Sequence, residues 1–270
     1  MDNIINLALQ EDISSGDITA GLIPPTKSHA SIISQQQAII CGTNFVTAVF
    51  AKIDPKLKIT WLVADADKVI KNQRLCELYG STQSLLTGER TALNFLQTLS
   101  STATLTKQYV QAIKGTKVQL LDTRKTLPGL RLAQKYAVKC GGGYNHRFGL
   151  YDAILIKENH ITACGSITKA IHQAKKRFPH IIEVEVKNLK EFDEALAANP
   201  TIIMLDNFTL KATRIAVKKN NGQTKLEASG GINLTNIRAF ATTGIDYISV
   251  GALTKTVIPI ELSMLFSPTS

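Results

Sequence analysis

Basic side chains gather in one stretch of the chain, between residues 122 and 160. Against them stand only the acids Asp122, Asp152 and Glu158. The basic members are Arg124, Lys125, Arg131, Lys135, Lys139, His146, Arg147, Lys157 and His160. An arginine fork donates two parallel hydrogen bonds to a carboxylate, whereas a lysine acts as a movable point charge. The stretch therefore predicts a site for a ligand with several carboxylates or phosphates.

Part of this charge is expected at the surface. Arg131, Lys135 and Lys139 follow one another at four-residue spacing on a predicted helix, so we expect at least two of them to face solvent. The other cations lie at predicted strand ends or beside the glycines 141–143. Such a triplet lets a backbone approach a ligand closely, although a loop that merely needs positive φ has the same sequence.

Two further glycine motifs follow the last two predicted strands, at 229–231 and 250–252. In β/α barrels, this is where backbone N–H groups and a helix N-terminus often bind phosphate. We therefore predict phosphate binding there.

Two carboxylates, Glu185 and Asp206, end adjacent predicted strands and are expected opposite the cations. They could bind magnesium through water, hydrogen-bond ribose hydroxyls or stabilise a cationic sugar in a transition state. For Glu183 and Glu227, a structural pairing with nearby lysines is as strongly indicated as a functional role. A Ser/His/Asp nucleophile motif and a Walker loop are both absent from the sequence.

The elements that must position these residues alternate along the second half of the chain. Short β-branched runs predict strands at 118–122, 153–157, 181–186, 201–206, 225–229 and 246–250. Amphipathic stretches predict helices at 130–139, 167–178, 189–198, 210–219 and 234–243. This alternation indicates an α/β fold with parallel strands, as a barrel or a doubly wound sheet, whose strand ends share one opening. Alternation within strands puts Glu183 with Glu185, and Glu227 with Ser229, on the face away from the helices.

The first half predicts an α+β sandwich domain. It has an amphipathic stretch at 4–9, strand-like runs at 30–40, 58–63 and 75–79, and a long helix from about Thr87 to Ile113. Thr87 is a reasonable N-cap, which would place Arg90 in the first turn, near a domain or subunit boundary.

Composition narrows the class of protein. Hydrophobic residues make up 44% and charged residues 19%, which is typical of a globular protein. No apolar run approaches the roughly 18 residues of a membrane span, and acids precede the first lysine, so we expect a cytoplasmic protein without membrane contact. The four cysteines lie far apart without zinc-site spacing and are expected to be reduced thiols.

A net charge of +10 suggests a polyanionic partner, either nucleic acid or a phosphorylated metabolite, or else lysines that serve solubility. The sequence contains neither aromatic stacking motifs nor a recognisable recognition helix, so we expect no nucleic-acid partner.

Several long motifs, in a fixed order over nearly the whole chain, resemble the quinolinate phosphoribosyltransferase family, also called carboxylating nicotinate-nucleotide pyrophosphorylases. They lie at residues 88–94 (GERTALN), 122–126 (DTRKT), 128–131 (PGLR), 141–147 (GGGYNHR), 155–160 (LIKENH) and 227–232 (EASGGI). The opening residues, with Asp17 and Thr19, are also similar to the start of the family.

The resemblance implies a sandwich domain at 1–115, an open β/α barrel at 116–255 and a C-terminal segment at 256–270 that returns to the sandwich. It implies a homodimer or higher homo-oligomer with shared active sites. The implied reaction joins quinolinate to 5-phosphoribosyl 1-pyrophosphate with release of carbon dioxide, in NAD biosynthesis and with Mg²⁺ as cofactor. A related phosphoribosyltransferase with another pyridine or heterocyclic acceptor is the alternative.

The resemblance also assigns roles by residue. Arg90 would come from the partner subunit, while Arg124, His146, Arg147 and Lys157 would hold the quinolinate carboxylates. Lys125, Glu185 and Asp206 are the implied catalytic residues, in contact with the phosphoribosyl donor, and the two acids would bind magnesium through water. Further implied substrate-binding residues are Thr123, Ser229, Gly230, Gly231, Val250, Gly251 and Ala252.

The sequence departs from the family pattern at a few places. Lys255-Thr256 replace a usual His-Ser, which questions a histidine contact to the donor while keeping a cation. Asn72 stands where a turn glycine is common, and Ser101-Thr102 replace a usual Gly-Ile; we expect these to affect turn geometry or packing only.

Overall fold

The chain forms two compact units in the computed structural model, which describes residues 1–177 and 181–267. The first unit contains residues 1–107, 127–142 and the C-terminal residues from Thr256 onward. The second unit contains residues 108–126 and 143–255. This division differs from the expected domains 1–115 and 116–255 in two ways: the second unit begins at residue 108, and residues 127–142 belong to the first unit.

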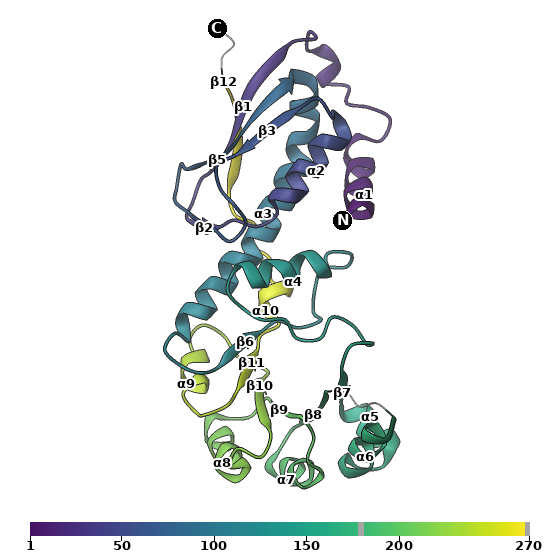
Figure 1. The fold of residues 1–270 in the computed structure, drawn as a ribbon, viewed down its shortest axis with the longest axis vertical. Coiled ribbons are helices and arrows are strands. Elements are labelled where there is room, and N and C mark those ends of the chain that lie inside the picture. Colours follow the sequence, from purple (N-terminus) through teal and green to yellow (C-terminus); the bar gives the residue numbers. More distant parts are fainter. Residues whose placement is uncertain (178–180, 268–270) are drawn as a thin grey trace. The chain divides into compact units, whose positions relative to one another are not determined.

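The first unit is built around an antiparallel sheet with the strand order β12-β1-β5-β3 (Figure 1). Its strands are β1 (Lys27–Ser34), β2 (Ala38–Ile39), β3 (Lys58–Trp61), β4 (Lys68–Val69), β5 (Arg74–Ser81) and β12 (Leu262–Ser267). Its helices are α1 (Asp2–Ile13), a 3₁₀ turn (Ala20–Leu22), α2 (Thr43–Ile53), most of α3 (Thr82–Ala112) and α4 (Arg131–Cys140). Alternate residues of β1 are buried, since one face of the sheet covers the core formed with α2 and α3.

The expected strand at 30–40 is divided between two sheets. β1 ends at Ser34, whose hydroxyl donates to the carbonyl of Gln36 (2.6 Å), and β2 then pairs with β4. Asn72 has φ 64°, so it holds the left-handed turn conformation for which relatives are expected to use glycine.

The expected start of the long helix at Thr87 was wrong. α3 begins at Thr82, directly after β5, and the Thr87 hydroxyl donates to Asp17 Oδ2 (2.9 Å) instead of capping the helix. The next residue, Gly88, is a packing position inside α3, because a Cβ there would lie 2.6 Å from the Phe50 ring. Arg90 is consequently not in the first turn.

The basic residues of α4 also differ from expectation. Lys135 is fully buried, Arg131 is partly buried and only Lys139 is exposed. A four-residue spacing could not distinguish these environments, because α4 packs in the first unit and not on the outside of the barrel sheet.

The second unit contains a six-stranded parallel sheet with the order β6-β11-β10-β9-β8-β7. Its strands are β6 (Gln119–Leu121), β7 (Ile154–Ile156), β8 (Ile182–Val186), β9 (Ile202–Asp206), β10 (Lys225–Ser229) and β11 (Tyr247–Ser249). Its helices are α5 (Glu158–Cys164), α6 (Ile167–Arg177), α7 (Leu189–Ala198), α8 (Leu210–Asn220), α9 (Ile237–Ala241) and α10 (Ala252–Lys255). The predicted α/β class is confirmed.

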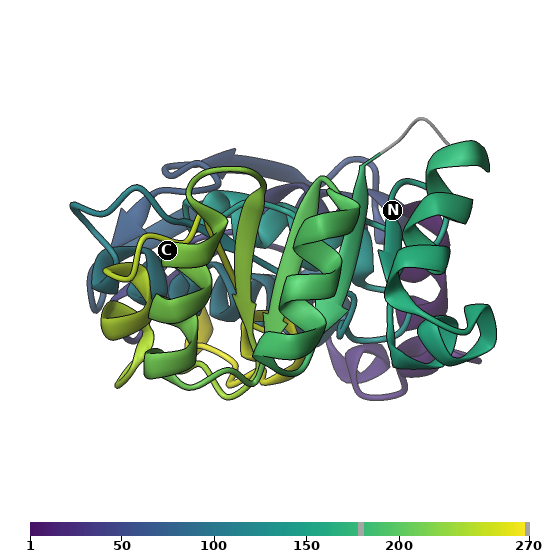
Figure 2. The same cartoon turned by 90° about the horizontal axis from the view of Figure 1, so that it is seen from below.

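The strands form an open arc, with β6 and β7 at its two edges and helices α5 to α9 along its outer side (Figures 1 and 2). Val184 and Val186 of β8 are fully buried, as expected for the face that helices cover. Helices α6, α7 and α8 match the predicted ranges closely, although Phe178 lies outside the described residues.

Helices α5 and α10 of this unit were not predicted, and α9 is shorter than predicted. α5 was not expected; the ring Nδ1 of His160 accepts the backbone N–H of Lys157 (3.0 Å) and so caps its first turn. α9 begins at Ile237 and not at Leu234, because the side chain of Asn233 accepts from the backbone of Thr235 (2.9 Å) and forms a turn first.

A bilayer-spanning helix would need both length and sustained apolarity. None of the helices within residues 1–177 and 181–267 combines the two.

Replacing Gly88 by valine is expected to destabilise the chain, because the new side chain would meet Phe50 and Ile53 Cδ1 (2.9 Å from the Cβ position). Such overpacking costs about 1–3 kcal/mol, which urea unfolding would measure. Gly21→Val is the matched control, since nothing lies within 4 Å of its Cβ position. An equal stability of the two variants would contradict the close packing of α3 on α2.

Candidate active site

The register of the parallel strands brings polar side chains to one edge of the sheet. Glu185 of β8 lies opposite Met204 of β9, and Asp206 lies opposite Ser229 of β10. Because side chains alternate between the faces of a strand, these residues share the face away from the helices. The alternation predicted from the sequence accounts for this placement.

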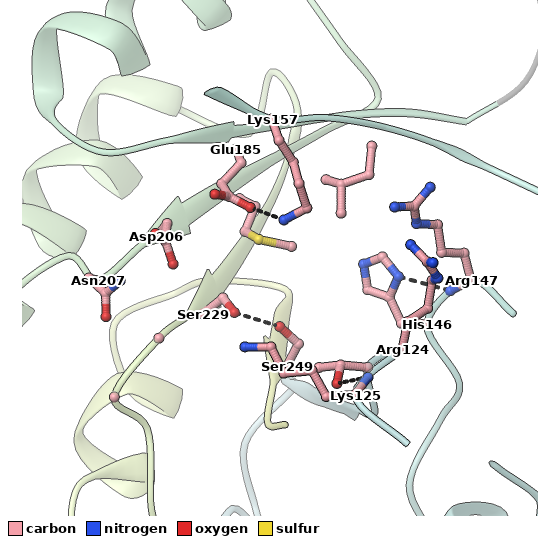
Figure 3. A pocket seen from close by; sticks show the side chains of 15 residues that line it. Arg124, Lys125, His146, Arg147, Lys157, Glu185, Asp206, Asn207, Ser229 and Ser249 are labelled. Atoms are coloured by element: carbon pink, nitrogen blue, oxygen red, sulfur yellow. Dashed lines mark hydrogen bonds and ion pairs between the residues drawn. The ribbon is translucent and has the colours of Figure 1, made fainter. Parts of the chain in front are cut away.

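A cavity of about 650 Å³ opens at this edge (Figure 3). It is lined by Thr123, Arg124, Lys125, His146, Arg147, Leu155, Lys157, Glu185, Met204, Asp206, Asn207, Ser229, Gly230, Gly231 and Ser249. The structure therefore brings together most of the residues that the sequence singled out for anion and sugar binding. All of them belong to the second unit.

Cationic groups gather on one side of the cavity, where Figure 3 shows Arg124, His146 and Arg147 close together. The guanidinium of Arg147 donates to the carbonyl of Ala153 (3.2 Å). Burial, and then repulsion from Arg124, lowers the pKa of Arg147. Two neighbouring guanidinium groups repel each other less when an anion lies between them, so this side suits a carboxylated ligand.

His146 is held by a group of buried acids beneath the cavity. Its Nδ1 accepts the backbone N–H of Arg147 (2.8 Å), and its Nε2 lies 2.9 Å from Glu183 and 3.7 Å from Glu227. Its own backbone N–H donates to Asp122 Oδ1 (2.9 Å). Glu183 and Glu227 thus pair with a histidine and not with lysines. Since protein groups engage both ring nitrogens, a contact from His146 to a ligand carboxylate would require one of them to be released.

Glu227 is fully buried, with His146 and the Ser249 hydroxyl as its polar neighbours. Burial, followed by repulsion from Glu183, raises the pKa of Glu227 to about 8. The raised pKa favours the neutral carboxylic acid over the carboxylate.

Carboxylates lie away from the arginines, on strands β8 and β9. Glu185 forms an ion pair with the ammonium of Lys157, and Asp206 lies beside Asn207 (Figure 3). These hard oxygen donors suit magnesium, which typically takes one or two protein carboxylates and completes its shell with water and substrate phosphates. The donor set thus fits Mg²⁺ bound together with a phosphorylated ligand.

The turn after β10 has a left-handed backbone, which favours glycine. Gly230 and Gly231 have φ 85° and 64°, and a Cβ on Gly230 would lie 2.3 Å from Asn207 Oδ1. The hydroxyls of Ser229 and Ser249 lie 3.0 Å apart at the same edge. Small residues and accessible backbone amides in this place suit a phosphate group.

Lys125 is positioned by the segment that follows β11. A Cβ on Gly251 would lie 3.1 Å from Lys125 Cδ, and the Thr254 hydroxyl donates to the Lys125 carbonyl (2.8 Å). The Thr123 hydroxyl accepts the backbone N–H of Lys125 (3.1 Å). Val250, Gly251 and Ala252 are not among the residues that line the cavity; the structure gives Gly251 the role of making room for Lys125.

Four lining residues were not predicted from the sequence: Leu155, Met204, Asn207 and Ser249. Leu155 and Met204 each precede a predicted ligand by two positions, so strand alternation could have identified them. Asn207 has φ 55° directly after a strand, a conformation that sequence does not reveal. Arg90 is exposed on α3 in the first unit, and its role in a site shared between subunits stays a prediction.

Comparisons with known proteins agree along the whole chain. The family models described as "Quinolinate phosphoribosyl transferase, N-terminal domain" and "Quinolinate phosphoribosyl transferase, C-terminal domain" match residues 17–100 and 102–265. A carboxylating nicotinate-nucleotide pyrophosphorylase of Mycobacterium leprae is 39% identical, over 96% of this chain and 95% of that protein. The structure of the nicotinate-nucleotide pyrophosphorylase from Francisella tularensis is 50% identical, with a TM-score of 0.96 over 98% of this chain and 95% of that chain.

The raised pKa of Glu227 predicts how stability depends on pH. In the unfolded chain this carboxyl ionises near 4.5, whereas in the folded chain its pKa is about 8, so the folded state binds the extra proton between these values. Wild-type stability should therefore fall, relative to that of Glu227→Gln, by on the order of a few kcal/mol as pH rises from 5 to 8. Urea unfolding at several pH values measures this difference. Glu11→Gln, at an exposed position, is the control and should show no such trend; a parallel pH dependence of wild type and Glu227→Gln would contradict the assignment.

Proposed function

Because the chain belongs to the quinolinate phosphoribosyl transferase family, we propose that it is the quinolinate phosphoribosyltransferase of NAD biosynthesis. It joins quinolinate to 5-phosphoribosyl 1-pyrophosphate and releases nicotinate mononucleotide, pyrophosphate and carbon dioxide. One observation carries this proposal: a single cavity has arginines on one side and carboxylates with a glycine turn on the other. The first side suits a dicarboxylate and the second a phosphorylated sugar.

The acceptor is assigned to the cationic side. Arg124 and Arg147 offer planar forks, and Lys157 offers a point charge at the end of β7. Quinolinate carries two adjacent carboxylates on a pyridine ring, so it can engage both arginines, and Lys157 as well when that ammonium leaves Glu185. His146 contributes by holding the backbone N–H of Arg147, and so helps to orient that arginine.

The phosphoribosyl donor is assigned to the carboxylate side. Glu185 and Asp206 would bind the ribose hydroxyls and, through water, Mg²⁺, while Lys125 approaches the pyrophosphate. The glycine turn after β10 would cradle the 5-phosphate with its backbone amides. Bound magnesium would neutralise charge on the departing pyrophosphate.

The first chemical step needs no general base. The pyridine nitrogen attacks the anomeric carbon with its own lone pair while the bond to pyrophosphate breaks. The sugar passes through an oxocarbenium-like transition state, whose positive charge Glu185 and Asp206 stabilise. Lys125 stabilises the leaving group, and the cavity holds both reactants in line.

The second step follows from the charge created by the first. The new pyridinium attracts electrons, so the carbon–carbon bond to the 2-carboxylate breaks and its electron pair stays on the ring as carbon dioxide leaves. A proton then adds to that ring carbon. The remaining carboxylate stays with the arginines, and the product is nicotinate mononucleotide.

Assembly and location are also part of the proposal. We infer a homodimer or higher homo-oligomer in which Arg90 from a second subunit completes each site, as the family resemblance implies. The protein is assigned to the cytoplasm, since its four cysteines are free thiols of the kind that a reducing compartment maintains.

The activity is tested with purified protein, magnesium, 5-phosphoribosyl 1-pyrophosphate and quinolinate labelled in the 2-carboxylate. We expect labelled carbon dioxide and nicotinate mononucleotide in equal amounts, with loss of turnover on chelation and recovery with magnesium. Turnover of nicotinate without carbon dioxide release would favour the acceptor alternative. Salt-sensitive oligonucleotide binding with no turnover would favour a nucleic-acid-binding protein instead.

Arginine geometry is tested by Arg147→Lys, which keeps the charge and removes the fork. We expect the KM for quinolinate to rise about 10- to 100-fold, since a charge-assisted bidentate contact is worth roughly 1.5–3 kcal/mol. The KM for the donor should change much less. Arg214→Lys, on the exposed face of α8, is the control and should leave both constants unchanged. An unchanged KM for quinolinate in Arg147→Lys would contradict the assigned acceptor side.

A further inference from the structure

Two of the four cysteines, Cys41 and Cys140, lie close together in the first unit. They are far apart in sequence, and no sequence motif indicates that they meet. Cys41, Asp65 and Cys140 each offer one ligand atom, and these three atoms all lie within 4.8 Å of one another. Cys41 follows β2, Asp65 precedes β4 and Cys140 ends α4. The group thus joins three separate segments of the first unit.

Short contacts hold the backbone of Cys41 and the side chain of Asp65. Cys41 is fully buried, and its backbone N–H donates to the hydroxyl of Ser100 (2.9 Å). Asp65 Oδ1 accepts the backbone N–H groups of Gly42 (3.0 Å) and Thr43 (3.1 Å) at the start of α2. Outer contacts of this kind orient ligands in metal sites.

The end of α4 is also held closely. A Cβ on Gly141 would lie 2.5 Å from the carbonyl oxygen of Ala103 and from Thr106 Cβ, so the helix end packs against α3 without space for a side chain. One turn earlier, the hydroxyl of Tyr136 lies beside Cys140 and Asp65. Packing of separate segments therefore places the three side chains together.

We propose that Cys41, Asp65 and Cys140 form a zinc-binding site. Zinc binds cysteine sulfur at about 2.3 Å and carboxylate oxygen at about 2.0–2.2 Å, so a tetrahedral ion would hold the two sulfur atoms about 3.8 Å apart. The separation of the ligand atoms in the structure has an upper bound of 4.8 Å, which includes this value. Cysteine sulfur and carboxylate oxygen are both ligands that zinc binds. Asp65 and Cys140 are partly exposed, which leaves the fourth position open to water.

A disulfide is the competing use of the two thiols. It requires a sulfur–sulfur distance of about 2.05 Å and gives no role to a carboxylate. The inclusion of Asp65 in the group favours a metal ion over a disulfide.

Cobalt(II) is the probe, because cobalt bound to thiolate shows a near-ultraviolet charge-transfer band that oxygen ligands do not produce. The full-length reduced protein is titrated with cobalt and then with zinc. We expect one equivalent of cobalt to produce the band and zinc to abolish it. Native mass spectrometry should find one zinc ion per chain, removed by a strong chelator.

Variants locate the site. Cys140→Ser and Cys41→Ser should each remove the cobalt band and weaken zinc binding at least about 100-fold, more than the roughly 10- to 100-fold expected for an outer contact. Cys164→Ser, in the second unit, is the matched control and should bind as the wild type does. Should Cys41→Ser fail to fold because of its buried position, Cys140→Ser at the partly exposed helix end still carries the test.

Protection of Cys140 from alkylation is a second measurement, and it needs no variant. Zinc should slow alkylation of Cys140, as measured by peptide mass spectrometry, and leave that of Cys164 unchanged. The proposal is overturned if cobalt gives no thiolate band in the folded wild type, if Cys140→Ser keeps it, or if mild peroxide yields a Cys41–Cys140 disulfide in protein that binds no zinc.

Discussion

Parallel pairing of β7, β8, β9 and β10 is the constraint on which the cavity depends. Since parallel strands end at the same edge of a sheet, Lys157, Glu185, Asp206 and Ser229 meet there although the chain passes through a helix between each pair. A register shift of one residue would turn these side chains toward the covering helices and bring apolar ones into the cavity. The buried Val184 and its neighbours on the helix side oppose such a shift.

The two sides of the cavity differ in charge, with arginines on one side and carboxylates on the other. Arg124 and Arg147 lie close enough for repulsion, together with burial, to lower the pKa of Arg147. Glu183 and Glu227 hold His146, and burial raises the pKa of Glu227, which favours its neutral form. Glu183 attracts Arg147 and offsets part of its charge, and the charge that remains is available to an anionic acceptor.

Local patterns in the sequence predicted the parts of the fold that depend on neighbouring residues. Apolar runs that end in polar residues identified the strands of the second unit, and alternation placed Glu185 and Ser229 on one face. Packing between distant segments was not accessible in this way. Thr87 was expected to cap the long helix, although it lies inside α3 next to Gly88, which makes room for Phe50. Nothing in the spacing of Cys41 and Cys140 indicated that they meet.

The central claim is that the cationic side holds two carboxylates of one ligand. Isothermal titration of the wild-type protein with quinolinate and with nicotinate, at the same pH and ionic strength, tests it most directly. One additional charge-assisted contact is worth roughly 1.5–3 kcal/mol, so quinolinate should bind about 10- to 100-fold more tightly than nicotinate. Equal affinities for the two pyridines would contradict the claim.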